Sequence, residues 1–113
     1  MNEGEKGYYR VTLEDILFLE ADNVWTIIHT KQKKKLIVNI GLSNFITEVQ
    51  YPELVKTHRS YGVNLNNIGH FKIGKTGGHI EIGEREVPVS RGQVKDFWND
   101  WKNYFGDDIP PQQ

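Results

Sequence analysis

Residues 56–65 read Lys56-Thr57-His58-Arg59-Ser60-Tyr61-Gly62-Val63-Asn64-Leu65, an unusual run for a strand in a small domain. Only one aliphatic residue precedes Leu65, and most of the others are polar or charged. An unpaired polar group in a protein interior costs on the order of 1–3 kcal/mol. The run therefore forms an internal hydrogen-bond network, or it faces a polyanion. We expect both, with His58, Ser60 and Asn64 tying the fold together while Arg59 projects outward.

The sequence before this run indicates short strands joined by polar turns. Residues 16–19 form an apolar run typical of a buried strand, and Asp22-Asn23 is predicted to be a turn. Residues 24–30 and 36–40 are two β-branched runs. A lysine cluster at residues 31–35 separates them, which predicts a hairpin and leaves open that these lysines are only its solvated tip.

The sequence after the run continues the β pattern. Residues 54–65 are predicted to be one extended segment, followed by a turn and by a strand at residues 68–73. Three glycines within residues 74–78 predict a turn or loop. Residues 79–82 and 86–89 then flank Gly83 as a further hairpin. Pro88 cannot donate a hydrogen bond to a sheet, so the last strand is expected to lie at an edge or to end there.

Two helices are predicted. The first covers residues 42–50, where apolar residues recur at helical spacing, and it ends near Pro52. The second begins at Ser90 and Gln93, which have the spacing of a capping box, with Val89 and Val94 at the positions of a hydrophobic staple. Its apolar stripe is predicted to cover a sheet face and consists of Val94, Phe97, Trp98, Trp101, Tyr104 and Phe105.

Length and composition favour one intracellular domain. The chain has 113 residues and no cysteine, so disulfides and thiolate chemistry are excluded. No apolar run approaches the roughly 18–20 residues of a membrane span, and no membrane partner is expected; the cytoplasm is the predicted location. We place the domain at residues 8–105, with flexible ends at 1–7 and 106–113.

Charge is unevenly distributed along the chain. Residues 1–22 carry a net charge of −4, residues 23–80 one of +6, and residues 81–113 one of −3. A basic middle between acidic flanks is what an electrostatic footprint for nucleic acid looks like, although solvated surfaces also show such segregation by chance.

Enzymatic chemistry has little support. The four histidines are scattered, no pair has the spacing of a helical metal site, and no metal or cofactor is expected. His58 and Ser60 are predicted to share a strand, but nothing nearby supplies an orienting acid or an oxyanion hole. The glycines of residues 74–78 do not match a phosphate-binding loop. We therefore expect that the protein is not an enzyme.

Four stretches together resemble the LytTR DNA-binding domain of bacterial response regulators. They are residues 14–21, the helix of residues 42–49, the run of residues 57–68, and Val87-Pro88-Val89-Ser90-Arg91 at the start of the final helix. The resemblance covers roughly residues 8–105. The sequence departs from the family pattern at Gly62, where a larger apolar residue is usual, and at Gly41, where Ser or Thr often caps the helix.

The resemblance implies a mostly β (α+β) fold with elongated antiparallel sheets, one short helix and a C-terminal amphipathic helix. It also implies binding of double-stranded DNA by loop and strand-end side chains in two successive major grooves, as the output domain of a transcriptional regulator in a two-component system. Arg59 and Arg91 match the family's base-reading positions, and Asn23 lies in its third contact region. An arginine can pair bidentately with guanine, and a cation at the start of a helix opposes the helix dipole, so Arg91 suggests a functional role.

Several further expectations follow from these assignments. His58, Ser60, Asn64 and Ser90 are expected to have a structural role and to hold the fold together. The phosphate contacts are expected from Lys34, Lys35, Lys56, Lys72 and Lys75, with Lys31 and Lys33 as further candidates. A compact domain of this length would be about 34 Å across, close to one turn of DNA at about 34–36 Å. A second copy on an adjacent repeat and a receiver domain outside this chain are possible partners.

Two other functions remain open at this point. A protein–protein interaction module would use the aromatic stripe of the final helix as its surface. Binding of RNA or single-stranded DNA would need exposed aromatic side chains on which bases can stack. The candidates for that stacking are Trp25, Tyr61 and Phe71.

Overall fold

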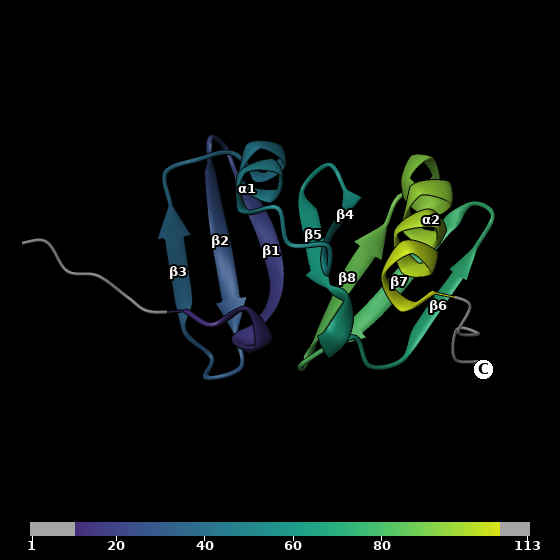
Figure 1. Cartoon of the computed structure of the whole chain (residues 1–113), viewed down its shortest axis with the longest axis horizontal. Helices are drawn as coiled ribbons and strands as arrows, with labels where there is room; N and C mark the ends of the chain where they lie inside the picture. The colour runs from purple at the N-terminus through teal and green to yellow at the C-terminus, as the bar shows by residue number, and fades with distance from the viewer. Residues whose placement is uncertain (1–10, 107–113) are drawn as a thin grey trace, which may run out of the picture.

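The computed structural model describes residues 11–106, as two antiparallel sheets that lie side by side along the long axis (Figure 1). The predicted flexible ends, residues 1–7 and 106–113, lie outside the described residues except for Gly106. The molecule measures 52 × 24 × 24 Å. The expected compact shape about 34 Å across was therefore wrong, because the chain builds two small sheets in a row instead of one rounded core.

The first sheet has five strands in the order β3-β2-β1-β5-β4. In chain order these strands are β1 (Ile16–Asp22), β2 (Trp25–Thr30), β3 (Lys35–Val38), β4 (Leu54–His58) and β5 (Tyr61–Asn64). All neighbouring pairs are antiparallel. The pairing of β1 with β5 sets Phe18 opposite Val63, and it joins the first three strands to the later β4–β5 hairpin.

One face of this sheet is covered by helix α1 (Leu42–Val49). Leu42 is buried against Leu19 and Ile28, and the partly buried side chain of Ile46 packs on the same cluster. Gly62 lies under the helix, and a Cβ atom there would be 3.2 Å from the Ile46 Cδ1 atom. Glycine at this position thus lets α1 approach the sheet closely, which accounts for the departure from the larger residue of the family pattern.

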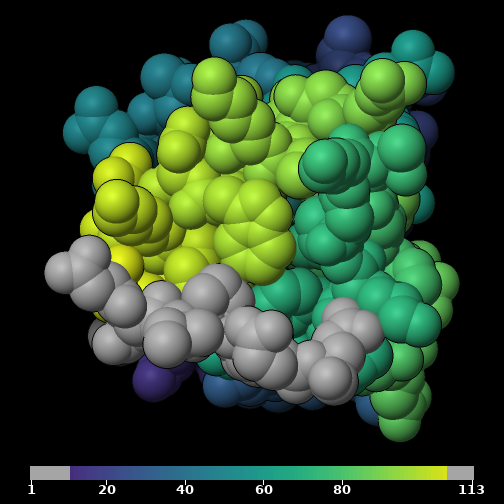
Figure 2. Space-filling model, turned by 90° about the vertical axis from the view of Figure 1, so that its right-hand side faces the viewer, coloured from purple at the N-terminus to yellow at the C-terminus, as the bar shows by residue number. Residues whose placement is uncertain are grey.

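The second sheet has three strands in the order β6-β7-β8 and carries the C-terminal helix. They are β6 (Phe71–Gly74), β7 (Gly77–Ile82) and β8 (Arg85–Val89), covered by α2 (Val94–Phe105). Figure 2 shows α2, in yellow-green, beside the green strands of this sheet. Phe97 and Trp101 of α2 are buried in the larger core, so the predicted stripe does cover a sheet face. None of the helices within residues 11–106 has the length and apolarity needed to span a membrane.

The polar run of residues 56–65 is a hairpin, and the single extended segment predicted there was wrong. The chain turns at Arg59 and Ser60 between β4 and β5. The backbone N–H of Ser60 donates to Nδ1 of His58 at 3.1 Å. A histidine side chain thus supports a turn that contains no glycine, proline or asparagine. His58 and Ser60 consequently do not share a strand.

Three other local predictions need correction. The strand predicted at residues 68–73 begins only at Phe71. The glycine-rich loop is shorter than expected, because β6 continues to Gly74 and β7 begins at Gly77. The capping box at Ser90 does not form: its side chain makes no capping hydrogen bond, and a 3-10 turn, η3 (Arg91–Gln93), precedes α2. This turn satisfies the backbone locally, since the N–H of Gln93 donates to the carbonyl of Ser90.

Asn64 is fully buried and joins three parts of the chain. Its Nδ2 donates to the carbonyl oxygens of Leu13 and Ile16 at 2.9 and 3.0 Å. Its Oδ1 accepts from the backbone N–H of Asn66 at 3.0 Å. These bonds fix two 3-10 turns, η1 (Leu13–Asp15) and η2 (Leu65–Asn67), against the first sheet. The amide therefore has its partners inside the fold.

Candidate nucleic-acid interface

Several turns meet along one long edge of the molecule, the upper edge in Figure 1. The backbone N–H of Ala21, near the end of β1, donates to the carbonyl of Ser60 in the β4–β5 turn at 2.8 Å. The N–H of Ser90 donates to the carbonyl of Thr57 at 2.8 Å, which joins the start of η3 to β4. We call this the arginine edge. Its members are the β1–β2 turn at Asn23, the β4–β5 turn at Arg59, the β6–β7 turn at Lys75, and Arg91 of η3.

Arg59 is exposed at the tip of the β4–β5 turn. Its neighbour His58 both supports the turn and packs edge-on against the Tyr61 ring, with ring centroids 5.8 Å apart. The turn that carries Arg59 is thus fixed by the hydrogen bond to His58 and by the packing of His58 on Tyr61. Within residues 11–106, its guanidinium makes no ion pair with an acidic side chain, so its charge is available to a ligand.

Arg91 is exposed at the first position of η3. The β6–β7 hairpin packs directly against its backbone, because a Cβ atom at Gly77 would be 3.2 Å from the Arg91 nitrogen and 2.6 Å from the Val89 carbonyl oxygen. Gly77 also has φ +112°, a conformation that suits glycine. A cation at the start of a helical turn gains nothing from the backbone dipole. Its position is therefore better explained by a ligand than by local stability.

Asn23 occupies the two-residue β1–β2 turn in a left-handed conformation, with φ 55°. Asparagine tolerates this region better than most residues. The side chains of Asn23 and of its neighbours Val24 and Trp25 are all exposed. The amide thus lies on the arginine edge with an apolar side chain beside it.

The predicted phosphate-binding lysines do not lie together. Lys75 belongs to the arginine edge, and Lys56 donates to Oγ of Ser43 in α1 at 2.6 Å. Lys72 is exposed on the face of the second sheet opposite its core, paired with His79. Lys34 and Lys35 lie in or beside the β2–β3 turn, at the lower edge in Figure 1. Ser43 was not anticipated, and its contact with Lys56 needs the packing of α1 on β4.

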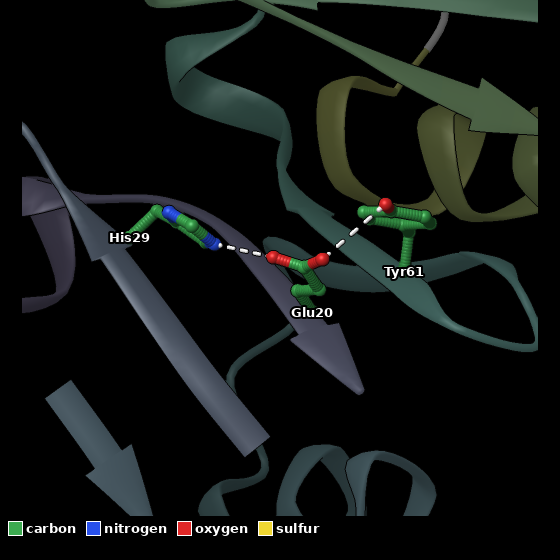
Figure 3. A network of polar contacts seen from close by, with 3 residues as sticks. All are labelled: Glu20, His29 and Tyr61. Atoms are coloured by element: carbon green, nitrogen blue, oxygen red, sulfur yellow. Dashed lines mark hydrogen bonds and ion pairs between the residues drawn. The ribbon is translucent and has the colours of Figure 1, made fainter. Parts of the chain in front are cut away.

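A buried polar network on the first sheet was also not anticipated (Figure 3). Nε2 of His29 lies 2.9 Å from Oε1 of Glu20, and the Tyr61 hydroxyl donates to Oε2 of Glu20 at 3.4 Å. The His29 ring stacks on Phe18 at 4.0 Å between centroids. Burial lowers the pKa of His29, and the Glu20 contact opposes this shift. The network links β1, β2 and β5 below the arginine edge.

Aromatic exposure and metal-binding potential bear on the other functions. Phe71 is buried and Tyr61 is partly buried and bonded to Glu20, so of the three aromatic residues considered for base stacking only Trp25 is well exposed, at 41%. Within residues 11–106, no three histidine, cysteine or acidic side chains come together as a group that could hold a metal ion.

Comparison with known proteins identifies the family. The family model described as "LytTr DNA-binding domain" matches residues 6–102. The transcriptional regulatory protein YpdB of Escherichia coli K12 is 28% identical over 88 residues, which cover 75% of this chain and 36% of YpdB; YpdB of Shigella flexneri gives the same values. This chain therefore spans about a third of the length of these relatives.

A solved structure has the same architecture. The LytTr DNA-binding domain of a response regulator from Bacillus cereus superposes with a TM-score of 0.68 and covers 85% of both chains, at 19% identity. The likeness confirms the predicted mostly antiparallel β fold with two helices. Because the family model matches most of the sequence, this chain belongs to the LytTr DNA-binding domain family.

Proposed function

We propose that this chain is the sequence-specific, double-stranded DNA-binding output domain of a transcriptional regulator, and that the arginine edge is its DNA-binding surface. One observation carries the proposal. Arg59 and Arg91, from separate parts of the chain, are both exposed on one edge, where backbone hydrogen bonds tie the β4–β5 turn to β1 and the start of η3 to β4. Side chains held on a rigid frame can be directed at fixed base positions, as sequence reading requires.

Each group on the edge has a role suited to its chemistry. Arg59 and Arg91 read guanine through its O6 and N7 atoms, and Asn23 pairs with adenine. Lys56 and Lys75 contact phosphates, which fixes the register without reading sequence. Lys34 and Lys35 are left out, because they lie on the opposite edge of a molecule 24 Å thick.

The shape of the molecule supports contact with more than one groove. The arginine edge runs along the long axis of 52 Å, while successive major grooves on one side of a duplex are about 34–36 Å apart. An edge of this length reaches from one groove into the next. The β1–β2 turn and the Arg91 region are well separated along it (Figure 1), so they are assigned to different grooves.

The biological setting belongs to the same proposal. The chain spans about a third of its curated relatives, so a receiver domain is proposed to act together with this domain in the cytoplasm. A second copy on an adjacent DNA repeat is a further proposed partner. We assign no catalytic activity to the domain. The interaction-module alternative is less favoured, because the stripe it would use puts Phe97 and Trp101 into the core.

Selection from a randomised duplex pool, followed by sequencing, tests this function. The wild-type protein is expected to enrich one motif. Arg59→Ala and Arg91→Ala are each expected to lose base preference at different positions of that motif. A wild-type protein that enriches nothing at low salt would overturn the proposal.

Lys102→Gln is the matched control. It removes one exposed positive charge from the last turn of α2, outside the arginine edge. It should enrich the same motif as the wild type. Loss of the motif in this variant would mean that overall charge, and not the position of the arginines, sets the preference.

A further inference from the structure

A cleft of about 340 Å³ opens on the edge opposite the arginine edge, between the β2–β3 turn and the β7–β8 turn. One wall comes from the first sheet and the other from the second sheet. A cleft of this volume is at the small end of the range for small-molecule sites. Its lining residues, which define the lysine cleft, are Leu17, Phe18, His29, Thr30, Lys31, Lys33, Lys34, Lys35, Gly83, Glu84 and Arg85.

The inner part of the lysine cleft suits a flat apolar group. Leu17 of β1 is partly exposed and contributes apolar surface, whereas Phe18 behind it is 1% exposed, with His29 stacked on its ring. The guanidinium of Arg85 lies 5.4 Å from the centroid of the Phe18 ring. A flat apolar group entering here packs on Leu17 and meets the Arg85 cation together, a combination that favours an apolar acid.

The rim of the cleft is strongly basic. Four lysines and Arg85 line it, against the single acidic residue Glu84. Glu84 pairs with Lys33 at 3.6 Å, but both side chains are more than 80% exposed, so this ion pair contributes little stability. The positive charge also acts on the wall of the cleft, because Arg85 and Lys35 are among the groups that lower the pKa of His29, after burial itself. The rim therefore has more positive than negative charge and attracts an anion.

The backbone conformation of the rim is a second indication that the cleft is a binding site. Lys33 adopts φ 63° in the β2–β3 turn, a left-handed conformation that glycine or asparagine adopts at lower cost. Non-glycine residues held in such conformations cluster at functional sites. The lysine at this position adds one more cation to the lining of the cleft, which glycine or asparagine would not supply.

From these observations we propose that the lysine cleft binds a small organic acid with a flat apolar body. The body packs against Leu17, and the acid group is held by Arg85, Lys34 and Lys35. Because the walls belong to different sheets, the bound acid joins the two halves of the domain. This inference goes beyond DNA recognition, because it uses none of the residues of the arginine edge.

Isothermal titration calorimetry of the whole chain with three probes tests the proposal. The probes are 1-naphthoate, its neutral analogue 1-naphthalenemethanol, and inorganic phosphate. 1-Naphthoate is expected to bind with a Kd at least about tenfold lower than that of either other probe, because only it has both the flat body and the acid. Equal binding of the neutral alcohol would overturn the role of the basic rim. Equal binding of phosphate would overturn the role of the apolar wall.

Variants locate the site. Arg85→Gln and the double variant Lys34→Gln/Lys35→Gln are each expected to weaken 1-naphthoate binding about tenfold, whereas Lys102→Gln leaves it unchanged. Two alternative results would overturn the proposal: unchanged binding in both cleft variants, or no heat of binding from the wild type at millimolar probe. No DNA is used, so the outcome is independent of the function proposed for the arginine edge.

Discussion

The two long edges of this domain are both basic, yet they differ in how their cations are held. The arginine edge has fewer cations, and backbone hydrogen bonds of 2.8 Å tie its β4–β5 turn to β1 and the start of η3 to β4. The lysine cleft has more cations, but they are mostly long exposed side chains in one turn, with Glu84 among them. The choice between the two edges proposed above therefore does not rest on the number of positive charges. Rigid placement on a surface of suitable length is the more informative property.

The largest difference between the edges is expected in DNA affinity. On a duplex carrying the selected motif, Arg59→Ala and Arg91→Ala should each raise Kd by roughly 5- to 150-fold, the equivalent of about 1–3 kcal/mol for a lost bidentate contact. Lys34→Ala/Lys35→Ala should change Kd by less than about twofold at 0.15 M salt, because the Debye length there is only about 8 Å. Fluorescence anisotropy measures all three. Equal losses at both edges would mean that the duplex contacts both.

The packing beneath Arg91 gives the next largest effect. Gly77→Ala introduces a side chain at φ +112°, with its Cβ 2.6 Å from the Val89 carbonyl oxygen, so we expect a loss of about 2 kcal/mol in the free energy of unfolding. Gly92→Ala, one residue after Arg91, is the control, because a Cβ there meets nothing within 4 Å. It should stay within about 0.5 kcal/mol of the wild type in urea unfolding. A neutral Gly77→Ala would show that the β6–β7 turn does not hold Arg91 in place.

The polar network between the edges should make stability depend on pH. Burial lowers the pKa of His29 below 6.5, so the unfolded chain binds more protons than the folded one as pH falls through that value. The contribution of neutral His29 to the free energy of unfolding is complete above pH 7. It is lost as the pH drops from 7 towards the pKa of His29 in the folded protein. Thermal unfolding from pH 7.5 to 5 measures this, and His29→Gln should flatten the slope. An equal slope in the variant would assign the dependence to other groups.

The smallest effect is expected at the lysine cleft itself. Lys33→Asn relieves an unfavourable left-handed backbone and should stabilise the protein by about 0.5 kcal/mol. Lys34→Asn is the matched control, since no positive φ occurs at Lys34, and it should give no gain. Urea midpoints of the two variants can be compared directly. A Lys33→Asn protein no more stable than Lys34→Asn would remove the argument from strain at this turn.

Local patterns were enough to predict most elements but not their assembly. The β2–β3 and β7–β8 hairpins and both helices follow from residue periodicity and turn residues near in sequence. The β4–β5 turn was missed because Arg59 is not a turn-forming type and Ser60 is only a weak one, and its support comes from the His58 side chain. The resemblance implied elongated sheets, but the estimate of about 34 Å was wrong because chain length alone predicts a rounded domain.

In the candidate site, too, the features set by local sequence were predicted and those set by strand assembly were not. The exposed positions of Arg59 and Arg91 agree with the resemblance to the family. Lys34 and Lys35 lie apart from these arginines, and this separation depends on which end of each strand faces which edge. Strand order is a long-range property, so no local pattern predicted it. The Glu20–His29–Tyr61 network was likewise invisible, since Tyr61 is distant in sequence from Glu20 and meets it only when β5 pairs with β1.

The pairing of β1 with β5 has a consequence for how the chain folds. Every other strand pair is a connection between consecutive strands, but Phe18 meets Val63 only after a loop of about 45 residues has closed. Closing such a loop costs chain entropy before its contacts form, which makes this pairing the slowest step. The second sheet, built from consecutive hairpins alone, is expected to form sooner. The β4–β5 hairpin brings Arg59 beside β1 only at that late step, so the surface proposed to bind DNA is complete only at the end of folding.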